Sequence, residues 1–236
     1  MKLEVCVADP QSLGEAVAGG ADRIELCSAL ELGGLTPLPG LIALAASAPI
    51  PVYALIRPRS GDFVFGPTDA DAMLRDIDAV RAAGLAGVVI GANRFNGELD
   101  IPLLERLMAQ AEGLGSTLHR CIDLVPDFAA ATEAAVDLGV ERILTSGGAA
   151  TALTGLENIV LAHTIAKGRL DIMAGSGVRL DNIAALLASA AIDDFHSSCA
   201  GDEYPSAPGA IRLGFATSTR RHTDARVVAA MKRALA

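Results

Sequence analysis

Several ionisable side chains stand in or directly after short apolar segments of the sequence. Glu25 lies within the run Arg-Ile-Glu-Leu, and His119 and His196 belong to later runs of the same kind. A carboxyl group or an imidazole can serve as a general acid or base, because burial and neighbouring charges tune its pKa. We therefore expect Glu25 and His119 to act as a catalytic acid–base pair. Asp123 is expected to orient either His119 or the adjacent Arg120.

Arginines and glycines after other apolar segments indicate that an anion binds. Arg57-Pro58-Arg59 places two guanidinium groups on a stiff turn, and a guanidinium suits carboxylate or phosphate. The runs Thr-Ser-Gly-Gly at 145–148 and Gly-Ser-Gly-Val at 175–178 would let backbone N–H groups approach an anion. Such loops also arise where a strand must simply turn tightly. The residues expected to bind the anion are Arg57, Arg59, Arg120, Ser146, Gly147, Gly175, Gly177, His196 and Ser198.

Two of the four cysteines could bind a soft metal ion. Cys6 and Cys27 lie near the ends of two successive apolar segments, and thiolates select Cu(I). The alternative is that both are small buried hydrophobic residues. Cys121 is a further candidate, as a nucleophile beside a histidine and an arginine. Zinc would need three or four convergent ligands, which two histidines and a glutamate could supply.

The composition excludes several classes of protein. Of the 236 residues, 51% are hydrophobic and 20% charged, which is enough apolar material for a sizeable core. The net charge of −9 and the 3% aromatic content argue against nucleic-acid binding. The most apolar stretch, Leu38 to Ile56, contains three prolines and is a poor membrane span. With no apolar leader at the N-terminus and no CxxC motif, we expect a protein of the cytoplasm.

Short apolar runs alternate with Ala- and Leu-rich stretches along the chain. The predicted strands are Leu3–Val7, Arg23–Leu26, Val52–Ile56, Gly87–Ile90, Thr117–Arg120, Arg142–Thr145, Asp171–Ala174 and Asp194–Ser197. The predicted helices are Gln11–Ala18, Pro39–Ala46, Asp69–Ala83, Ile101–Glu112, Asp127–Leu138, Gly155–Ala166, Asn182–Ala188 and a last one from Asp224 to the end.

Alternating strands and helices of this kind predict a parallel sheet with right-handed crossovers. Eight such units in 236 residues match a compact (β/α)8 TIM barrel, and we expect residues 1–236 to form one barrel domain. The alternative fold is an open doubly wound sheet, which typically has a glycine-rich loop after its first strand. The sequence at this place is Val7-Ala8-Asp9-Pro10 instead. The irregular stretch 200–223 exceeds usual loop lengths, so it is functional, mobile or contains a short helix.

Strand periodicity predicts which side chains face the inside of the barrel. Side chains alternate between the two faces of a strand, and helices cover the outer face of a barrel, which must therefore be apolar. The polar parity then places Glu4, Glu25, His119 and His196 inside, near the end of the barrel that carries active sites. Each of these alone could be half of a core salt bridge. Together they favour a pocket, because burying many charges without a ligand is costly.

Several motifs together resemble the CutC copper-homeostasis family. They cover residues 2 to about 200 in order. The motifs are Glu4-Val5-Cys6, Gly20-Ala21-Asp22-Arg23-Ile24-Glu25-Leu26-Cys27, Gly33-Gly34-Leu35-Thr36-Pro37, Ile56-Arg57-Pro58-Arg59 with Gly61-Asp62-Phe63, His119-Arg120 with Asp123, Leu144-Thr145-Ser146-Gly147 and Phe195-His196-Ser197-Ser198. Two departures are Cys121-Ile122, where the family usually has Ala-Phe, and Ser60, where it usually has Gly.

The resemblance implies a TIM barrel in the cytoplasm and a homo-oligomer, often a dimer. It also implies a role in copper tolerance and, as in some relatives, Cu(I) binding at Cys6 and Cys27. The residues themselves leave a second function open, which is an enzyme acting on a small anionic metabolite, sugar-like or phosphorylated, at the barrel rim. In that case Glu25, His119 and the two arginines at 57 and 59 would form the site.

Overall fold

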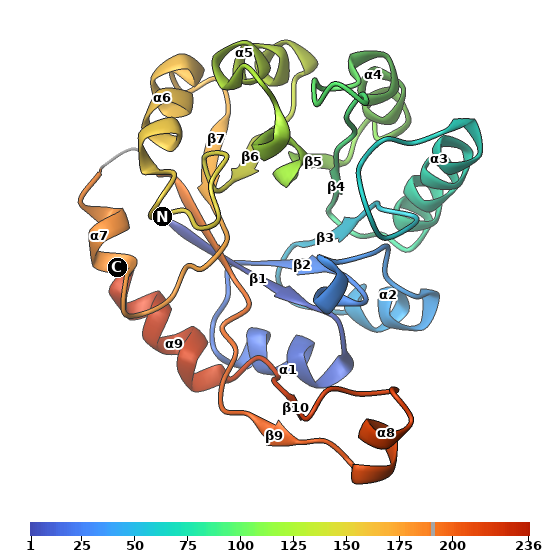
Figure 1. The fold of residues 1–236 in the computed structure, drawn as a ribbon, viewed down its shortest axis with the longest axis vertical. Helices are drawn as coiled ribbons and strands as arrows, with labels where there is room; N and C mark the ends of the chain where they lie inside the picture. The colour runs from blue at the N-terminus through green and yellow to red at the C-terminus, as the bar shows by residue number, and fades with distance from the viewer. Residues whose placement is uncertain (190–191) are drawn as a thin grey trace.

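A closed barrel of parallel strands forms the centre of the molecule (Figure 1). The structure is a computed structural model and describes residues 1–189 and 192–236. Neighbouring strands pair in sequence order, and β8 closes the ring against β1. The strands are β1 (Lys2–Val7), β2 (Arg23–Leu26), β3 (Val52–Leu55), β4 (Gly87–Ile90), β5 (Gly115–Leu118), β6 (Arg142–Thr145), β7 (Asp171–Ala174) and β8 (Asp194–Ser197). The TIM-barrel prediction is confirmed.

A helix follows each barrel strand and covers the outside of the ring (Figure 1). The helices are α1 (Pro10–Ala18), α2 (Pro39–Ala45), α3 (Pro67–Ala82), α4 (Ile101–Gln110), α5 (Phe128–Leu138), α6 (Leu156–Ala166), α7 (Ile183–Leu187) and α9 (Ala225–Ala234). Aspartates fix several helix starts, because their carboxylates accept hydrogen bonds from otherwise free backbone N–H groups. Asp9 accepts from the N–H of Ser12, and Asp127 accepts from that of Ala130.

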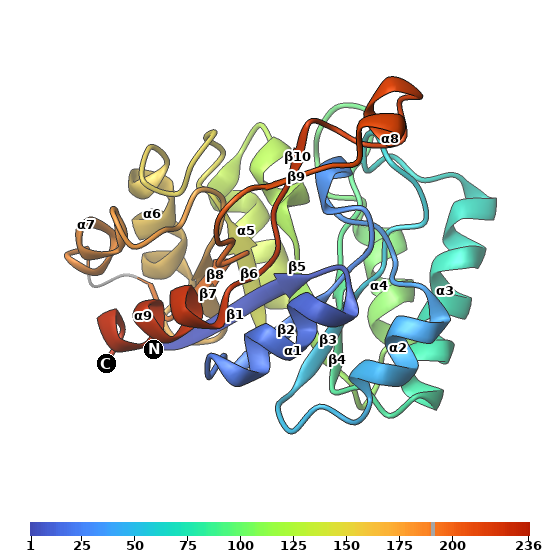
Figure 2. The same cartoon turned by 90° about the horizontal axis from the view of Figure 1, so that it is seen from below.

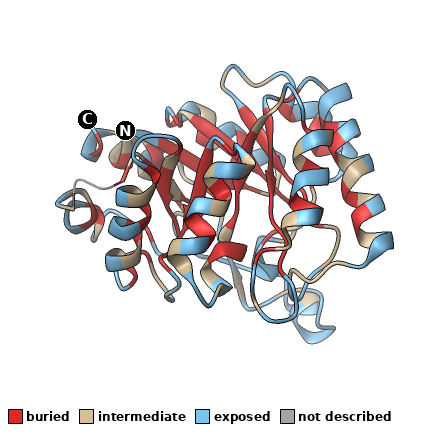
Figure 3. Cartoon of the chain, turned by 90° about the horizontal axis from the view of Figure 1, so that it is seen from above, coloured by how far each residue is buried: buried red, intermediate tan, exposed pale blue. Residues whose placement is uncertain are grey.

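The apolar core lies between the strands and the helices (Figure 3). Val5, Ile24 and Ile90 on the strands are fully buried, as are Met73 and Leu104 on the helices. These are the outward-facing strand positions, so their apolar character follows from burial beneath the helix layer. Among the described helices, none is both long and apolar enough to cross a bilayer.

Ion pairs fill the inside of the barrel near the beginnings of the strands. Arg23 is paired with Glu4 and, at 2.9 Å, with Asp194, and all three are buried. Arg142 donates to the hydroxyl of Thr117 at 2.9 Å. The ring of Tyr53 lies under both guanidinium groups, 5.6 Å from that of Arg23 and 4.8 Å from that of Arg142. Glu4 thus points into the barrel as predicted, and there it forms a core salt bridge with Arg23.

The fifth strand is displaced from its predicted position. It spans Gly115–Leu118 rather than Thr117–Arg120, and a 3-10 helix occupies Arg120–Leu124. The chain turns here because the Nδ1 atom of His119 accepts a hydrogen bond from the N–H of Cys121 at 3.1 Å. His119 thus lies just beyond the strand, where its side chain caps the turn.

The stretch 200–223 forms a small excursion beyond the ring of helices (Figures 1 and 2). It contains the antiparallel pair β9 (Tyr204–Pro205) and β10 (Thr219–Arg220), with the short helix α8 (Pro208–Arg212) between them. The excursion is closed at its base by a bridge between Ala200 and Thr223. Both ends of the excursion therefore return to the same side of the barrel.

Candidate functional site

A cavity of about 920 Å³ opens at the carboxyl ends of the barrel strands. Its walls come from strand ends and from the loops that follow them, which is where TIM barrels carry their chemistry. The lining residues include Cys6, Glu25, Leu55, Arg57, Phe63, His119, Arg120, Leu144, Ser176, Gly177, His196, Ser198 and Cys199. The cavity therefore brings together many of the residues that the sequence predicted for a site.

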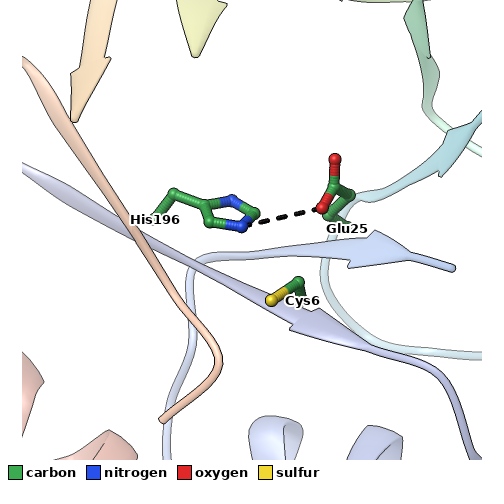
Figure 4. Close-up of side chains that lie close together, drawn as sticks. All are labelled: Cys6, Glu25 and His196. Atoms are coloured by element: carbon green, nitrogen blue, oxygen red, sulfur yellow. Dashed lines mark ion pairs between the residues drawn. The ribbon is translucent and has the colours of Figure 1, made fainter. Parts of the chain in front are cut away.

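One wall carries a compact cluster of Cys6, Glu25 and His196 (Figure 4). The thiol sulfur, a carboxylate oxygen and an imidazole nitrogen lie within 4.8 Å of one another. Sheet register produces this cluster, because β1 lies between β2 and β8 and pairs Cys6 directly with Glu25. The Nε2 atom of His196 is 3.6 Å from the Glu25 carboxylate.

Hydrogen bonding orients His196 within this cluster. Its Nδ1 atom lies 2.8 Å from the carboxylate of Glu4. Burial alone would raise the pKa of Glu4, but the hydrogen bond from His196 and the charge of Arg23 overcome this and lower it to about 2. Burial opposes protonation of His196, yet the neighbouring Cys6 and Glu25 raise its pKa well above the ordinary value. Glu4 therefore fixes the ring and leaves Nε2 facing the thiol and Glu25.

Glu25 and Cys27 lie side by side at the end of β2. Burial raises the pKa of Glu25, and the nearby Glu4 charge adds to the shift while His196 opposes it. The thiol of Cys27 donates to the Glu25 carboxylate at 3.5 Å. Cys27 is only 1% exposed and packs among Tyr53, Leu55 and Val89 rather than lining the cavity. Of the predicted thiol pair, Cys6 belongs to the compact cluster. Cys27 contacts the Glu25 carboxylate but does not line the cavity.

Cys199 is a cavity residue that the sequence analysis did not identify. It lies two residues beyond β8, and its backbone has a φ of +44°, a left-handed conformation that few side-chain-bearing residues adopt. Its N–H donates to the hydroxyl of Ser197 at 3.1 Å. Burial raises the pKa of its thiol to about 11, and the nearby Cys6 contributes. No period-two pattern extends past the strand, so only the cysteine itself marked this position.

Arg57 and His119, which follow β3 and β5, also line the cavity and share the ring of Phe63. The guanidinium of Arg57 lies 4.9 Å from the centre of this ring, and the imidazole of His119 lies 4.8 Å from it. Arg57 donates to the carbonyls of Leu32 and Gly34 at 2.9 and 2.8 Å. Its Nε atom has no partner among the described residues. Phe63 belongs to the motif Gly61-Asp62-Phe63 that follows the Arg-Pro-Arg turn, and the sequence predicted no role for its side chain.

His119 is held in a neutral form. Its Nδ1 atom accepts from the N–H of Cys121, so the ring proton lies on Nε2, which has no partner among the described residues. Burial and then the charge of Arg57 lower the pKa of His119 to about 3. A neutral imidazole with a fixed Nε2 proton is a hydrogen-bond donor. This arrangement argues against the acid–base role predicted for His119.

Asp123 occupies the glycine-rich loop after β6. Its carboxylate accepts from the backbone N–H groups of Ser146 and Gly148, at 3.1 and 3.0 Å. It also accepts from the guanidinium of Arg120 at 2.8 Å. The expectation that Ser146 and Gly147 bind a ligand anion is therefore corrected, because the loop already surrounds a carboxylate of the chain itself. Asp123 orients Arg120 and makes no hydrogen bond to His119.

The remaining predicted anion-binding residues divide between cavity and surface. Arg59 pairs with Asp62 and Asp69 at 3.1 and 3.2 Å and does not line the cavity, so its predicted place in the pocket is wrong. Gly177 and Ser198 line the cavity. Gly175 is packed against the side chains of Leu144 and His196, and an added Cβ would lie 2.4 Å from the leucine. Its role is close packing of the chain.

Neutral His119 has a consequence for the pH dependence of stability. Its pKa of about 3 in the folded state is below the ordinary 6.5, so the unfolded chain takes up the proton first. We expect His119 to remove stability as pH falls from 6.5 toward 3, by at most about 1.4 kcal/mol per pH unit. Urea unfolding of wild type and His119→Gln across this range measures the difference.

The matched control for this measurement is His163→Gln. His163 is 40% exposed and lies 3.7 Å from Asp193 on the surface. Its variant is expected to follow the wild-type curve, whereas His119→Gln has a shallower one. Parallel curves for wild type and His119→Gln would show that His119 is protonated normally in the folded state.

Known proteins resemble this chain along nearly its whole length. The model of the CutC family matches residues 1–201. A CutC family protein of Rhizobium meliloti is 55% identical over 232 residues, covering 98% of this chain and 95% of the relative. One from Caulobacter vibrioides is 53% identical over 236 residues, covering 99% of this chain and 96% of the relative.

Solved structures show the same architecture. A CutC protein from Streptococcus agalactiae superimposes with a TM-score of 0.79 at 28% identity, covering 84% of this chain and 99% of that one. Deoxyribose phosphate aldolase from Aeropyrum pernix superimposes with a TM-score of 0.62 at 15% identity, covering 84% of this chain and 85% of that one. The second likeness concerns the barrel fold alone.

Proposed function

Because this chain belongs to the CutC family, we propose that it takes part in copper homeostasis by binding Cu(I) through Cys6 and Cys27, with His196 as a further ligand. One observation carries the proposal, namely that a thiol, an imidazole nitrogen and a carboxylate of Cys6, His196 and Glu25 lie within 4.8 Å of one another. The CutC protein of Streptococcus agalactiae, which is named for copper homeostasis and is similar over 84% of this chain, also supports the proposal. We place the activity in the cytoplasm, whose reducing conditions keep thiols free.

The chemistry of the donors suits Cu(I). Thiolate sulfur and imidazole nitrogen are the soft and intermediate ligands that this ion prefers. A histidine that binds a metal through one nitrogen commonly donates its other N–H to a carboxylate. His196 has this arrangement, because Glu4 accepts at Nδ1 and Nε2 faces the cluster. Cys27 would reach the ion from behind Glu25, whose carboxylate its thiol contacts at 3.5 Å.

Replacement of Cys6 is expected to weaken Cu(I) binding more than about 100-fold, since loss of a direct ligand exceeds the usual effect of an outer contact. Cys27→Ser is expected to weaken Cu(I) binding as strongly, because Cys27 supplies the second thiolate ligand. The measurement is an anaerobic competition titration with a Cu(I) chelator, using the full chain. Elemental analysis of the purified protein identifies the metal it carries.

The matched control is Cys121→Ala. This thiol is fully buried in the hydrophobic core and does not line the cavity. Its removal is expected to leave Cu(I) affinity unchanged. An affinity that is the same in wild type, Cys6→Ser and Cys27→Ser would refute the copper proposal. An effect of Cys6→Ser without one of Cys27→Ser would replace Cys27 by His196 as the second ligand.

A second candidate function is catalysis on a small anionic metabolite, sugar-like or phosphorylated. The cavity of about 920 Å³ favours it, because this is the size of a small-molecule pocket rather than of an ion site. In this function Glu25, with its raised pKa, would exchange protons with the substrate. Native mass spectrometry of the purified protein separates the two candidates, since a bound organic molecule supports the second and bound copper alone the first.

A further inference from the structure

We propose that Arg57 and His119 together bind the anionic oxygens of a small organic ligand, a carboxylate or a phosphate monoester, on one wall of the cavity. The proposal rests on the second candidate function, in which the cavity holds a metabolite, and does not involve copper. It is carried by two buried, unpartnered donors that share one aromatic ring.

Arg57 has a positive charge without a compensating carboxylate. It is 4% exposed. Its terminal nitrogens donate to backbone carbonyls, including that of Gly61 at 2.6 Å, and its Nε atom has no partner in the described part of the chain. Backbone carbonyls fix the guanidinium in place but leave its charge unpaired. A buried unpaired charge is costly, so an anion bound here gains a strong electrostatic interaction.

The other arginines of the cavity differ from Arg57 in this respect. Arg120 is paired with Asp123 at 2.8 Å, and Arg221 with Glu203 at 2.6 Å. Arg179 is paired with Asp181 at 3.4 Å. Within residues 1–189 and 192–236, Arg57 is the one cavity-lining arginine that has no ion pair. The charge pattern therefore selects a single guanidinium for the ligand.

His119 supplies the second donor at a fixed position. Its ring is packed closely against Gly91, where an added Cβ would lie 2.2 Å from Cε1, and contacts Phe63 through ring centres 4.8 Å apart. The hydrogen bond from Cys121 to Nδ1 keeps the proton on Nε2. Because burial and Arg57 lower the pKa of His119 to about 3, this donor persists at neutral pH. A neutral donor beside a guanidinium is suited to oxygen anions.

Phe63 contacts both donors. The same ring lies 4.9 Å from the guanidinium carbon of Arg57 and 4.8 Å from the imidazole of His119. Both side chains are held by backbone contacts before a ligand arrives, Arg57 by carbonyls and His119 by an N–H. Such preorganised donors bind an anion without first having to be ordered.

The test uses metal-free, full-length protein with 15N-labelled histidine. Inorganic phosphate and citrate are titrated separately at constant ionic strength, with sodium chloride as the blank. We expect a saturable shift of the His119 Nε2 resonance with at least one of the two anions and none at His163. Arg57→Gln is expected to weaken the response about 10-fold or more, whereas Arg59→Gln leaves it unchanged.

The outcomes decide between the alternatives. A response to citrate alone assigns a carboxylate ligand, and a response to phosphate alone assigns a phosphate ester. Absence of a saturable shift with both, or an equal shift in Arg57→Gln, overturns the proposal. If Arg57→Gln does not fold, His119→Gln decides, because it must abolish the thermal stabilisation that the responding anion gives to wild type.

Measuring the anion response and Cu(I) binding on the same variants distinguishes this proposal from the copper site. Cys6→Ser is expected to retain the anion response, since its thiol belongs to the cluster with Glu25 and His196. A missing anion response in protein that still binds Cu(I) would refute only the anion site. Loss of Cu(I) binding in protein that still responds to the anion would refute only the copper site.

Discussion

Replacement of Arg23 with leucine is expected to lower the free energy of unfolding by about 3–5 kcal/mol. Glu4 and Asp194 are 0% and 3% exposed, and both accept from this one guanidinium. Without Arg23, Glu4 would keep only His196, and Asp194 only the guanidinium of Arg142 at 3.9 Å, as partners of opposite charge in the described part of the chain. Urea denaturation followed by circular dichroism measures the loss.

An exposed ion pair provides the comparison. Arg221 is 58% exposed where it pairs with Glu203 at 2.6 Å. Arg221→Leu is expected to change the free energy of unfolding by less than about 1 kcal/mol, because water already solvates both charges. Equal effects of Arg23→Leu and Arg221→Leu would mean that water solvates the inner ion pairs as well, contrary to the burial of Arg23, Glu4 and Asp194.

Alanine in place of Gly147 is expected to lower the free energy of unfolding by at least about 3 kcal/mol. The residue has a φ of +70°, and an added Cβ would lie 2.0 Å from the carbonyl oxygen of Gly155. Backbone must therefore move, and with it the loop that surrounds the Asp123 carboxylate. The loss is measured by urea unfolding, and crystallography or amide exchange locates the displaced loop.

Gly139 separates the two causes of this effect. Its φ of +74° is similar, but an added Cβ there would meet nothing within 4 Å. Gly139→Ala is thus expected to cost only about 1–2 kcal/mol, the penalty of the left-handed conformation. If Gly147→Ala costs no more than Gly139→Ala, the close approach of the two backbone segments is not important for stability.

The barrel could be predicted because its signals are local. Each strand is a short apolar run, which gave the strand positions. Glycine, proline or aspartate at the ends of the helical stretches gave the helix positions. The displaced fifth strand shows where this fails. His119 uses its own side chain to cap the following turn, and a histidine that ends a strand looks the same in sequence as one inside it.

The site was predicted less completely because its decisive contacts join distant parts of the chain. Asp123 fills the loop at 145–148, so a glycine-rich anion motif is satisfied internally. The sequence paired Cys6 with Cys27, but register pairs Cys6 with Glu25, and the Cys27 thiol contacts the Glu25 carboxylate without lining the cavity. Residue type alone does not say which distant side chain hydrogen-bonds to a loop. It also does not say which residues of two neighbouring strands lie side by side.

The chain of buried charges from Arg23 through Glu4 to His196 bears on how this barrel can acquire new specificities. A substitution in the cluster of Cys6, Glu25 and His196 disturbs groups on which folding depends. Selection there must therefore preserve stability while it changes ligand binding. Arg57 and His119 are tied instead to backbone atoms and to Phe63. Laboratory evolution toward altered ligands should therefore accumulate its first tolerated changes around Arg57 and His119.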